Sequence, residues 1–358
     1  MTHRMMNMGR GLGSTRLALV GMFLLAIGAA LSYDNPAETP VWVLVVPLAF
    51  LAVNLLAAIA TNPRINRRGG LLVFHLGLLA IIVLAGVGRL THFDAQLEIT
   101  EGTPFSPSDL TNLEKGPLHS GALQQLAFVQ GSFTVDYSSG MVRGLTHSQV
   151  LIPDGQANAS GGGQGWQTKV VGDDRPLILE GYRFYTTFNK GFAPILTWIP
   201  EQGEAISGTI HMPPYPLFEY KQDSSWTPPN GQEIKFWLRL KTGLREDAAW
   251  VLNGKTATGV LVVNTGEQRV ELEPGQNVQL PGGNLRYDRL TTWMGYKVFY
   301  DPTLHWLFGA ALIAITGLAT HFWLKVGVRV PSSHAAGSPA GSIGRLQKMP
   351  ETTDGRFL

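Results

Sequence analysis

The chain has 358 residues, of which 44% are hydrophobic and 15% are charged, and its formal net charge is +2. A soluble protein of this length normally carries about 25% charged residues, so a wholly water-soluble fold is disfavoured. The chain contains no cysteine, which excludes disulfides, thiol–disulfide exchange and thiolate-ligated iron–sulfur clusters.

Four blocks of the chain come close to the roughly 20 mostly apolar residues that a membrane span requires. They are residues 16–32, 41–60 and 71–88, which together fill residues 16–89, and residues 303–324. We therefore predict an integral membrane α-helical bundle of four transmembrane helices. The first block has the basic start and small-residue end of a signal peptide. Because a second block follows after a short loop, we expect the first to remain as an uncleaved helix.

The basic residues predict how these helices are oriented. Arg4, Arg10 and Arg16 precede or begin the first block, and Arg64, Arg67 and Arg68 lie between the second and third. The first loop carries only the acidic Asp34 and Glu38. By the positive-inside rule, the N-terminus (1–15) and a disordered tail (325–358) are cytoplasmic. The large segment 90–302 then lies outside a bacterial cytoplasmic membrane.

The segment 90–302 reads as a mostly-β, antiparallel, sandwich-like domain. Residues 95–125 contain turn formers and few regular patterns, and residues 156–165 read as a flexible loop. Short apolar or alternating runs separated by glycine- and proline-rich turns then predict strands. These runs are residues 133–137, 148–152, 168–172, 177–188, 193–199, 233–240, 258–263, 268–273 and 284–290. No GxSxG or HExxH motif, phosphate loop or internal repeat is present.

Two smaller patterns in this domain favour ordinary structural roles. The pair Asp173 and Asp174 is typical of a solvated turn. Tyr182 and Phe184 share one strand face, with Tyr185 on the other, and together with Phe188 they predict core and interface packing.

Nine histidines provide the candidate ligand residues. His3 and His334 lie in terminal segments, and His92 follows the third block. We expect His119, His147 and His211 to be surface or locally bonded side chains. The remaining three are His75 within the third block, and His305 and His321 near the two ends of the fourth.

His75 interrupts the otherwise apolar stretch "LLVFHLGLLAIIV". Ionisable groups inside membrane spans tend to mark functional sites, and a neutral imidazole is a ligand for metals and haem iron. The alternative is a hydrogen bond to a neighbouring helix. His305 and His321 lie near the interfaces, where a histidine is less costly to bury, and His321 is expected at a depth similar to that of His75.

Three stretches together resemble the ResB (CcsB) family of System II cytochrome c maturation. They are "FHLGLLAIIVLAG", "GYRFYTTF" and "TTWMGYKVFYDPTLHWLFGAALIAITGLATHFW". The order of spans and β domain also fits, although Thr303 stands where the family usually has glycine. The resemblance implies a non-catalytic or accessory subunit of a cytochrome c haem-lyase complex.

The resemblance also implies the partners and the cofactor. A ResC (CcsA)-like membrane protein would supply the tryptophan-rich haem motif, since the nine tryptophans here are scattered. The pair would move haem b to the outer face and attach it to apocytochrome c, with His75 as an axial ligand and His321 and His305 as further candidates. Membrane lipid is an expected contact and nucleic acid is not.

Two other functions compete with this interpretation. A sensor or anchor that displays a ligand-binding β domain would have the same topology, but it would not explain His75. A stand-alone transporter is disfavoured, because transporters are commonly built from internal repeats.

Overall fold

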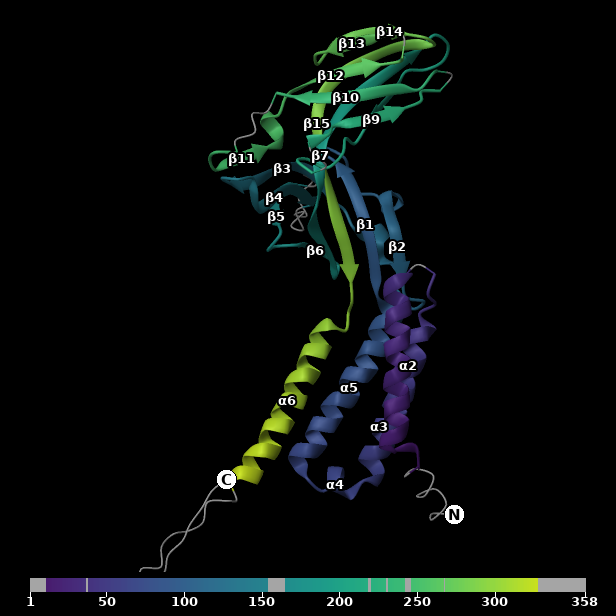
Figure 1. Cartoon of the computed structure of the whole chain (residues 1–358), viewed down its shortest axis with the longest axis vertical. Helices are drawn as coiled ribbons and strands as arrows, with labels where there is room; N and C mark the ends of the chain where they lie inside the picture. The colour runs from purple at the N-terminus through teal and green to yellow at the C-terminus, as the bar shows by residue number, and fades with distance from the viewer. Residues whose placement is uncertain are drawn as a thin grey trace, which may run out of the picture.

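In the computed structural model, four long helices form one end of the molecule and a β domain forms the other (Figure 1). The structure describes residues 11–36, 38–153, 165–217, 220–229, 231–241, 246–266 and 268–327. The helices are α2 (Thr15–Asp34), α3 (Trp42–Thr61), α5 (Gly69–Thr91) and α6 (Leu304–Gly327), and the short α4 (Pro63–Asn66) connects α3 to α5.

The four long helices confirm the predicted spans. Each has the length and hydropathy of a membrane-crossing helix, and each begins and ends within three residues of the predicted bounds. The predictions for residues 1–10, for the loop 156–164 and for the tail from residue 328 lie outside the described residues.

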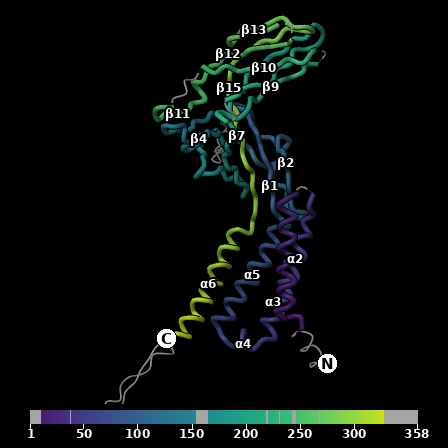
Figure 2. The backbone as a smooth tube through the Cα atoms, viewed as in Figure 1, coloured from purple at the N-terminus to yellow at the C-terminus, as the bar shows by residue number. Residues whose placement is uncertain are grey.

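The helices form an open row with α2 and α6 on opposite sides (Figure 2). α5 packs against α6 on one side and α3 on the other, and α2 packs against α3. Glycines allow α5 and α6 to approach closely: a Cβ on Gly77 would lie 2.7 Å from the backbone nitrogen of Ala314. At the other seam, the buried Asn54 of α3 donates hydrogen bonds to the carbonyls of Leu12 and Ser14, at the start of α2.

Among the described residues, the β domain contains three sheets, and all of the paired strands are antiparallel. The central sheet has the order β2 (Leu110–Lys115), β1 (Phe93–Thr100), β15 (Gly283–Tyr300), β7 (Tyr182–Pro200), β6 (Leu177–Leu179), with β14 (Asn277–Leu280) on β15 and β8 (Ile206–Thr209) on β7. A second sheet has the order β13 (Arg269–Leu272), β12 (Gly259–Asn264), β10 (Ile234–Leu240), β9 (Asp223–Trp226). The third has the order β11 (Trp250–Asn253), β3 (Val129–Ser138), β4 (Val142–Pro153), β5 (Trp166–Gly172).

The expectation that residues 95–125 lack regular structure is wrong for β1 and β2. β1 is an inner strand of the central sheet, paired with β15 from Phe93 opposite Tyr300 to Thr100 opposite Trp293. Its residues alternate, with Phe93 and Leu97 among those buried and Asp94 and Glu98 on the other face. The alternation of the strand begins directly after the apolar helix α5. The residue at which the helical period ends and the strand period begins is therefore difficult to predict from sequence.

The predicted strand 177–188 is divided by a turn. Glu180 and Gly181 have φ values of 47° and 84°, which is the conformation of a two-residue hairpin loop between β6 and β7. β7 then continues without interruption through Pro200 and absorbs the separate strand predicted at 193–199. The other predicted runs lie within or overlap β3, β4, β5, β10, β12, β13 and β15.

Two helices continue almost directly into the central sheet. Only His92 separates α5 from β1, and Asp301, Pro302 and Thr303 connect β15 to α6. Thr303 donates from its backbone nitrogen and its hydroxyl to Oδ1 of Asp301, at 2.8 and 2.7 Å. Its hydroxyl also lies 2.9 Å from the position of a Cβ on Gly88, so a side chain at that position would collide with it.

Candidate functional site

The imidazole of His75 is half-buried in the apolar part of α5. Its Nδ1 lies 2.7 Å from the carbonyl oxygen of Leu71, one turn earlier in the same helix. A carbonyl can only accept a hydrogen bond, so Nδ1 carries the proton in the neutral ring, and the lone pair is on Nε2. Among the described residues the hydrogen bond of His75 is therefore within its own helix, in contrast to the interhelical bond that was the alternative expectation.

His75 lies on the side of α5 that faces α3. Gly86, eleven residues further along, lies within about 20° of the same helical face, and its Cβ position is 4.0 Å from Leu48 of α3. Gly77 is rotated by roughly 200° from His75 and faces Ala314 of α6. Phe74 packs edge-on against the imidazole, with 5.1 Å between ring centroids.

The other two candidate histidines are not brought to His75. His321 lies at the level of Gly70, whose Cβ position is 2.7 Å from the His321 backbone nitrogen. His75 is five residues further along α5, which corresponds to about 7.5 Å along the axis. His305 is exposed on the first turn of α6, at the opposite end of that helix. Within the described part of the chain, no three His, Cys, Asp or Glu side chains come together as a metal site.

A cavity of about 440 Å³ opens where the helices meet the β domain. Leu25, Leu44, Leu48 and Leu307 line it on the helix side. Arg89, His92, Asp94, Glu114 and Asp301 line its polar side. Arg89 donates to the hydroxyl of Ser32 at 3.1 Å, and Asp94 pairs with Lys297. The cavity therefore combines apolar walls with a polar rim.

His119 ties the β domain to the end of α5, and sequence analysis did not anticipate this role. Its Nδ1 lies 3.1 Å from the carbonyl of Thr91 and its Nε2 lies 2.6 Å from the hydroxyl of Tyr182. The ring stacks on Phe93 and meets Tyr300 edge-on. The expectation of a surface or locally bonded side chain is wrong for His119.

The same expectation is wrong for His211, and it is confirmed for His147. His211 bonds to the buried Thr100 at 2.8 Å and stacks on Trp293 with 5.0 Å between centroids. The His147 side chain is 40% exposed, and its contact is with Asp136 on the neighbouring strand at 3.5 Å.

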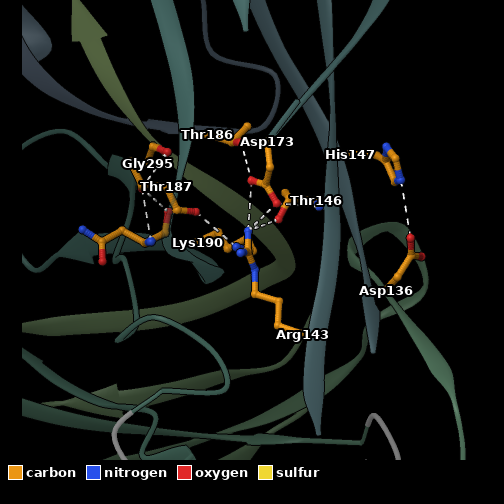
Figure 3. Close-up of polar contacts among 10 residues, drawn as sticks. Asp136, Arg143, Thr146, His147, Asp173, Thr186, Thr187, Lys190 and Gly295 are labelled. Atoms are coloured by element: carbon orange, nitrogen blue, oxygen red, sulfur yellow. Dashed lines mark hydrogen bonds and ion pairs between the residues drawn. The ribbon is translucent and has the colours of Figure 1, made fainter. Parts of the chain in front are cut away.

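Asp173 holds together three strands of the β domain, as Figure 3 shows. It receives hydrogen bonds from Arg143 at 2.8 and 3.0 Å, from the hydroxyl of Thr186 at 2.7 Å and from the backbone of Thr146 at 3.0 Å. Partial burial alone would raise the pKa of Asp173, but these hydrogen bonds and the Arg143 charge hold it below its usual value. Asp173 and Asp174 both lie exposed in a bend directly after β5, which confirms the predicted solvated turn, but the hydrogen bonds of the Asp173 carboxylate were not predicted.

Lys190 is a buried cation beside this cluster. Its side chain is 1% exposed and its Nζ donates to the carbonyl of Thr187 at 3.1 Å (Figure 3). Burial, reinforced by the charge of Arg143, lowers the pKa of Lys190 to about 7, and Asp173 opposes the shift. Both side chains contact the ring of Phe188, whose centroid lies 4.3 Å from the Arg143 guanidinium carbon and 5.9 Å from Nζ of Lys190.

The predicted core packing of the nearby aromatic residues is confirmed for Tyr182 and Phe184. Tyr182 and Phe184 are fully buried, whereas Tyr185 and Phe188 are exposed. Burial, reinforced by the neighbouring Tyr300, raises the pKa of Tyr182 to about 12, so its hydroxyl remains protonated and can donate to His119.

A comparison with known protein families matches the part of the chain that contains His75 and the β domain. A model described as the ResB-like family matches residues 58–330. The chain is 24% identical over 255 residues to a cytochrome c biogenesis protein CcsB of Microcystis aeruginosa, covering 71% of this chain and 52% of that protein. It is 22% identical over 311 residues to a protein of the same name from a Nostoc species, covering 81% and 62%. The chain thus spans between half and two thirds of the length of these curated relatives.

Proposed function

Because the chain belongs to the ResB-like family, we propose that it acts with a ResC (CcsA)-like membrane protein to move haem b across the membrane and attach it to apocytochrome c. The relatives are named as cytochrome c biogenesis proteins. In this proposal the chain is an accessory subunit of a bacterial cytoplasmic membrane complex, with its β domain on the outer side and both termini in the cytoplasm.

The observation that carries the proposal is the tautomer that the structure imposes on His75. The carbonyl of Leu71 occupies Nδ1, so Nε2 is the nitrogen that can coordinate iron. A leucine would fill the same space in an apolar helix without a polar group to bury. An imidazole whose Nδ1 is hydrogen-bonded to the backbone and whose Nε2 lone pair can coordinate iron is suited to be an axial ligand of a transported haem. When bound, the haem would supply the iron and the vinyl groups that become linked to cytochrome thiols.

The partner is expected to complete the pocket around this histidine. The row α2–α3–α5–α6 is open, and α6 exposes Trp306, Phe308 and Ile315 to more than 60% each. Gly309, also on α6, has no atom within 4 Å of its Cβ position, so another helix could approach the backbone closely there. One open layer of helices cannot enclose a porphyrin on both sides, so we expect partner helices to cover it.

The test is the haem absorption spectrum of the purified complex with and without His75. The variant His75→Leu should insert and fold normally, yet lose most of its bound haem and its cytochrome c product. The variant His75→Gly should behave similarly, and added imidazole should restore part of the haem binding by entering the vacated space. His147→Ala, at a partly exposed position in the β domain, serves as the control and should keep wild-type haem content.

The proposal fails if the His75→Leu complex carries haem at the wild-type level and still matures cytochrome c. Full synthase activity of this chain alone, in a cell without a ResC-like protein, would refute the partner assignment. His321→Ala provides a further comparison, because loss of haem in that variant would place a second ligand on this chain.

A further inference from the structure

A basic cleft lies at the end of the helix row that is furthest from the β domain. It has a volume of about 420 Å³ and is lined by Arg68, Gly69, Gly70, His321, Leu324 and Lys325. The first turn of α5 forms one wall and the last turns of α6 form the other. Gly70 brings the helices together, with its Cβ position 2.9 Å from the carbonyl oxygen of Gly317.

The cleft is at the level of lipid headgroups if the helices cross a membrane. α6 has 24 residues, which corresponds to about 36 Å, slightly more than the roughly 30 Å of the hydrocarbon layer. The β domain is attached at the other end of α5 and α6 (Figure 1). The cleft therefore opens in the leaflet opposite the β domain, whichever side of the membrane that domain occupies.

Within the part of the chain that the structure describes, no acidic side chain pairs with the positive charge of this cleft. Residues 39–93 and 302–327 contain no Asp or Glu, so no acidic side chain lies near the cleft in sequence. Among the described residues, Arg68 and Lys325 are exposed and form no ion pair. The helix also begins here without a capping side chain, so the first N–H groups of α5 add to the positive potential.

The surroundings of the cleft are suited to acyl chains. Leu324 lines it, and the neighbouring Trp323 is 80% exposed on α6. Tryptophan is enriched at membrane interfaces, where its ring lies between headgroups and chains. A ligand that joins an anionic head to an apolar tail matches both parts of this surface.

We propose that this cleft binds the phosphate-bearing headgroup of an anionic phospholipid, held by Arg68 and Lys325 with His321 beside it. Basic pockets between transmembrane helices are known sites for such headgroups. Arg64 and Arg67 belong to the same connection but do not line the cleft. Binding at the cleft by Arg68 and Lys325 therefore differs from a non-specific attraction of the whole basic connection to a negatively charged membrane.

The test uses the full-length protein in mixed vesicles of phosphatidylglycerol and phosphatidylcholine, with retained lipid identified by native mass spectrometry. The wild type should retain phosphatidylglycerol in preference to phosphatidylcholine. The double variant Arg68→Gln/Lys325→Gln should lose that preference by roughly thirtyfold, the equivalent of about 2 kcal/mol for two contacts. The swap Arg68→Lys/Lys325→Arg keeps both charges and should retain the lipid.

The matched control is Arg64→Gln/Arg67→Gln, which removes the same charge from the same connection and should leave retention unchanged. Equal loss in both neutralised variants would overturn the proposal in favour of diffuse attraction. Full retention by Arg68→Gln/Lys325→Gln would overturn it directly. Inorganic phosphate at millimolar concentration should not displace the lipid, and displacement would replace the lipid assignment by a site for a free anion.

Discussion

At the scale of single residues, His119 supports the junction between the β domain and the helices. The variant His119→Ala removes hydrogen bonds to Thr91 and Tyr182 together with the stacking on Phe93. We expect the free energy of unfolding to fall by about 2–4 kcal/mol, since packing and two hydrogen bonds are lost at once. Chemical denaturation followed by tryptophan fluorescence measures the change.

The partly exposed His147 provides the comparison for this prediction. Its contact with Asp136 is 3.5 Å long at the surface of the domain. His147→Ala should therefore change the free energy of unfolding by less than about 0.5 kcal/mol. If both variants unfold alike, His119 does not stabilise the junction.

Lys190 should make the stability of the β domain depend on pH. Its pKa is lowered to about 7 in the folded protein by burial, whereas a lysine in the unfolded chain has its ordinary value near 10.4. Between these values the unfolded chain binds more protons, so the free energy of unfolding rises as the pH rises. Below pH 7 both states are protonated and the full penalty of the buried charge is present.

The variant Lys190→Met should remove that penalty and flatten the profile. We expect it to unfold at higher denaturant concentration than the wild type at pH 6, with the difference shrinking toward pH 9. The gain should be on the order of 1–3 kcal/mol. The exposed Lys169 is the matched position, and Lys169→Met should leave the pH dependence unchanged. A Lys190→Met profile that still rises with pH like the wild type would contradict the prediction.

The sequence alone pointed to His75 as a candidate ligand, but it did not reveal the contacts of His119 and Asp173. A single imidazole in an apolar run of helical length stands out because burying it is unfavourable. The partners of His119 and Asp173 could not be found in the same way. His119 bonds to Tyr182, 63 residues away, and Asp173 bonds to Arg143, 30 residues away. Such pairs arise only when the strands take their places in the sheets.

At the scale of elements, the seam between α5 and α6 depends on small residues. A side chain at Gly77 would meet the backbone of Ala314, with the Cβ position 2.7 Å from its nitrogen and 2.8 Å from its Cα. The variant Gly77→Leu should force the helices apart. We expect a loss of at least about 1–3 kcal/mol, measured as a lower thermal unfolding midpoint of the purified chain in detergent.

Gly309 on α6 provides the control for the seam. Its Cβ position has no atom within 4 Å, so Gly309→Leu should leave the midpoint of the isolated chain unchanged apart from a small gain in helix propensity. Equal destabilisation by both variants would show that the α5–α6 contact does not explain the effect. Gly317, also on α6, does take part in the seam, because its Cβ position lies 2.5 Å from the backbone nitrogen of Phe74 on α5.

The ends of the four long helices could be predicted because a single strong property, a long apolar run, defines each of them. About 20 apolar residues in succession define a membrane span, and the four helices follow that rule closely. β1 was missed because its alternation starts at Phe93, next to the end of α5. The division into three sheets depends on contacts between distant strands, such as β1 with β15, which no local pattern contains.

At the scale of the whole molecule, the β domain and the α5–α6 pair form one continuous unit. β1 and β15 pair directly, and each continues into a helix within a few residues. The loop around Gly116 adds hydrogen bonds to the end of α5, from Gly116 to His92 and from Leu118 to Leu90. A displacement of the β domain would therefore be transmitted to α5, the helix that carries His75.

The absence of cysteine allows the orientation of the whole chain to be tested by labelling. The variant Ser139→Cys places a thiol in the exposed turn between β3 and β4, and Asn66→Cys places one at the end of α4. The positive-inside rule assigns the basic connection around α4 to the cytoplasm and the β domain to the outer side. A membrane-impermeant maleimide should therefore label Ser139→Cys in intact spheroplasts, and label Asn66→Cys only after lysis.

The two labelling sites control for one another because they lie at opposite ends of the same helices (Figure 1). A folded but inverted protein would give the reverse pattern, and would move the open end of the lipid cleft to the outer leaflet. Labelling of both thiols in intact spheroplasts would mean that the helices do not separate the two ends of the molecule. Only the first pattern, with Ser139→Cys alone accessible, places His75 toward the cytoplasmic side of the membrane.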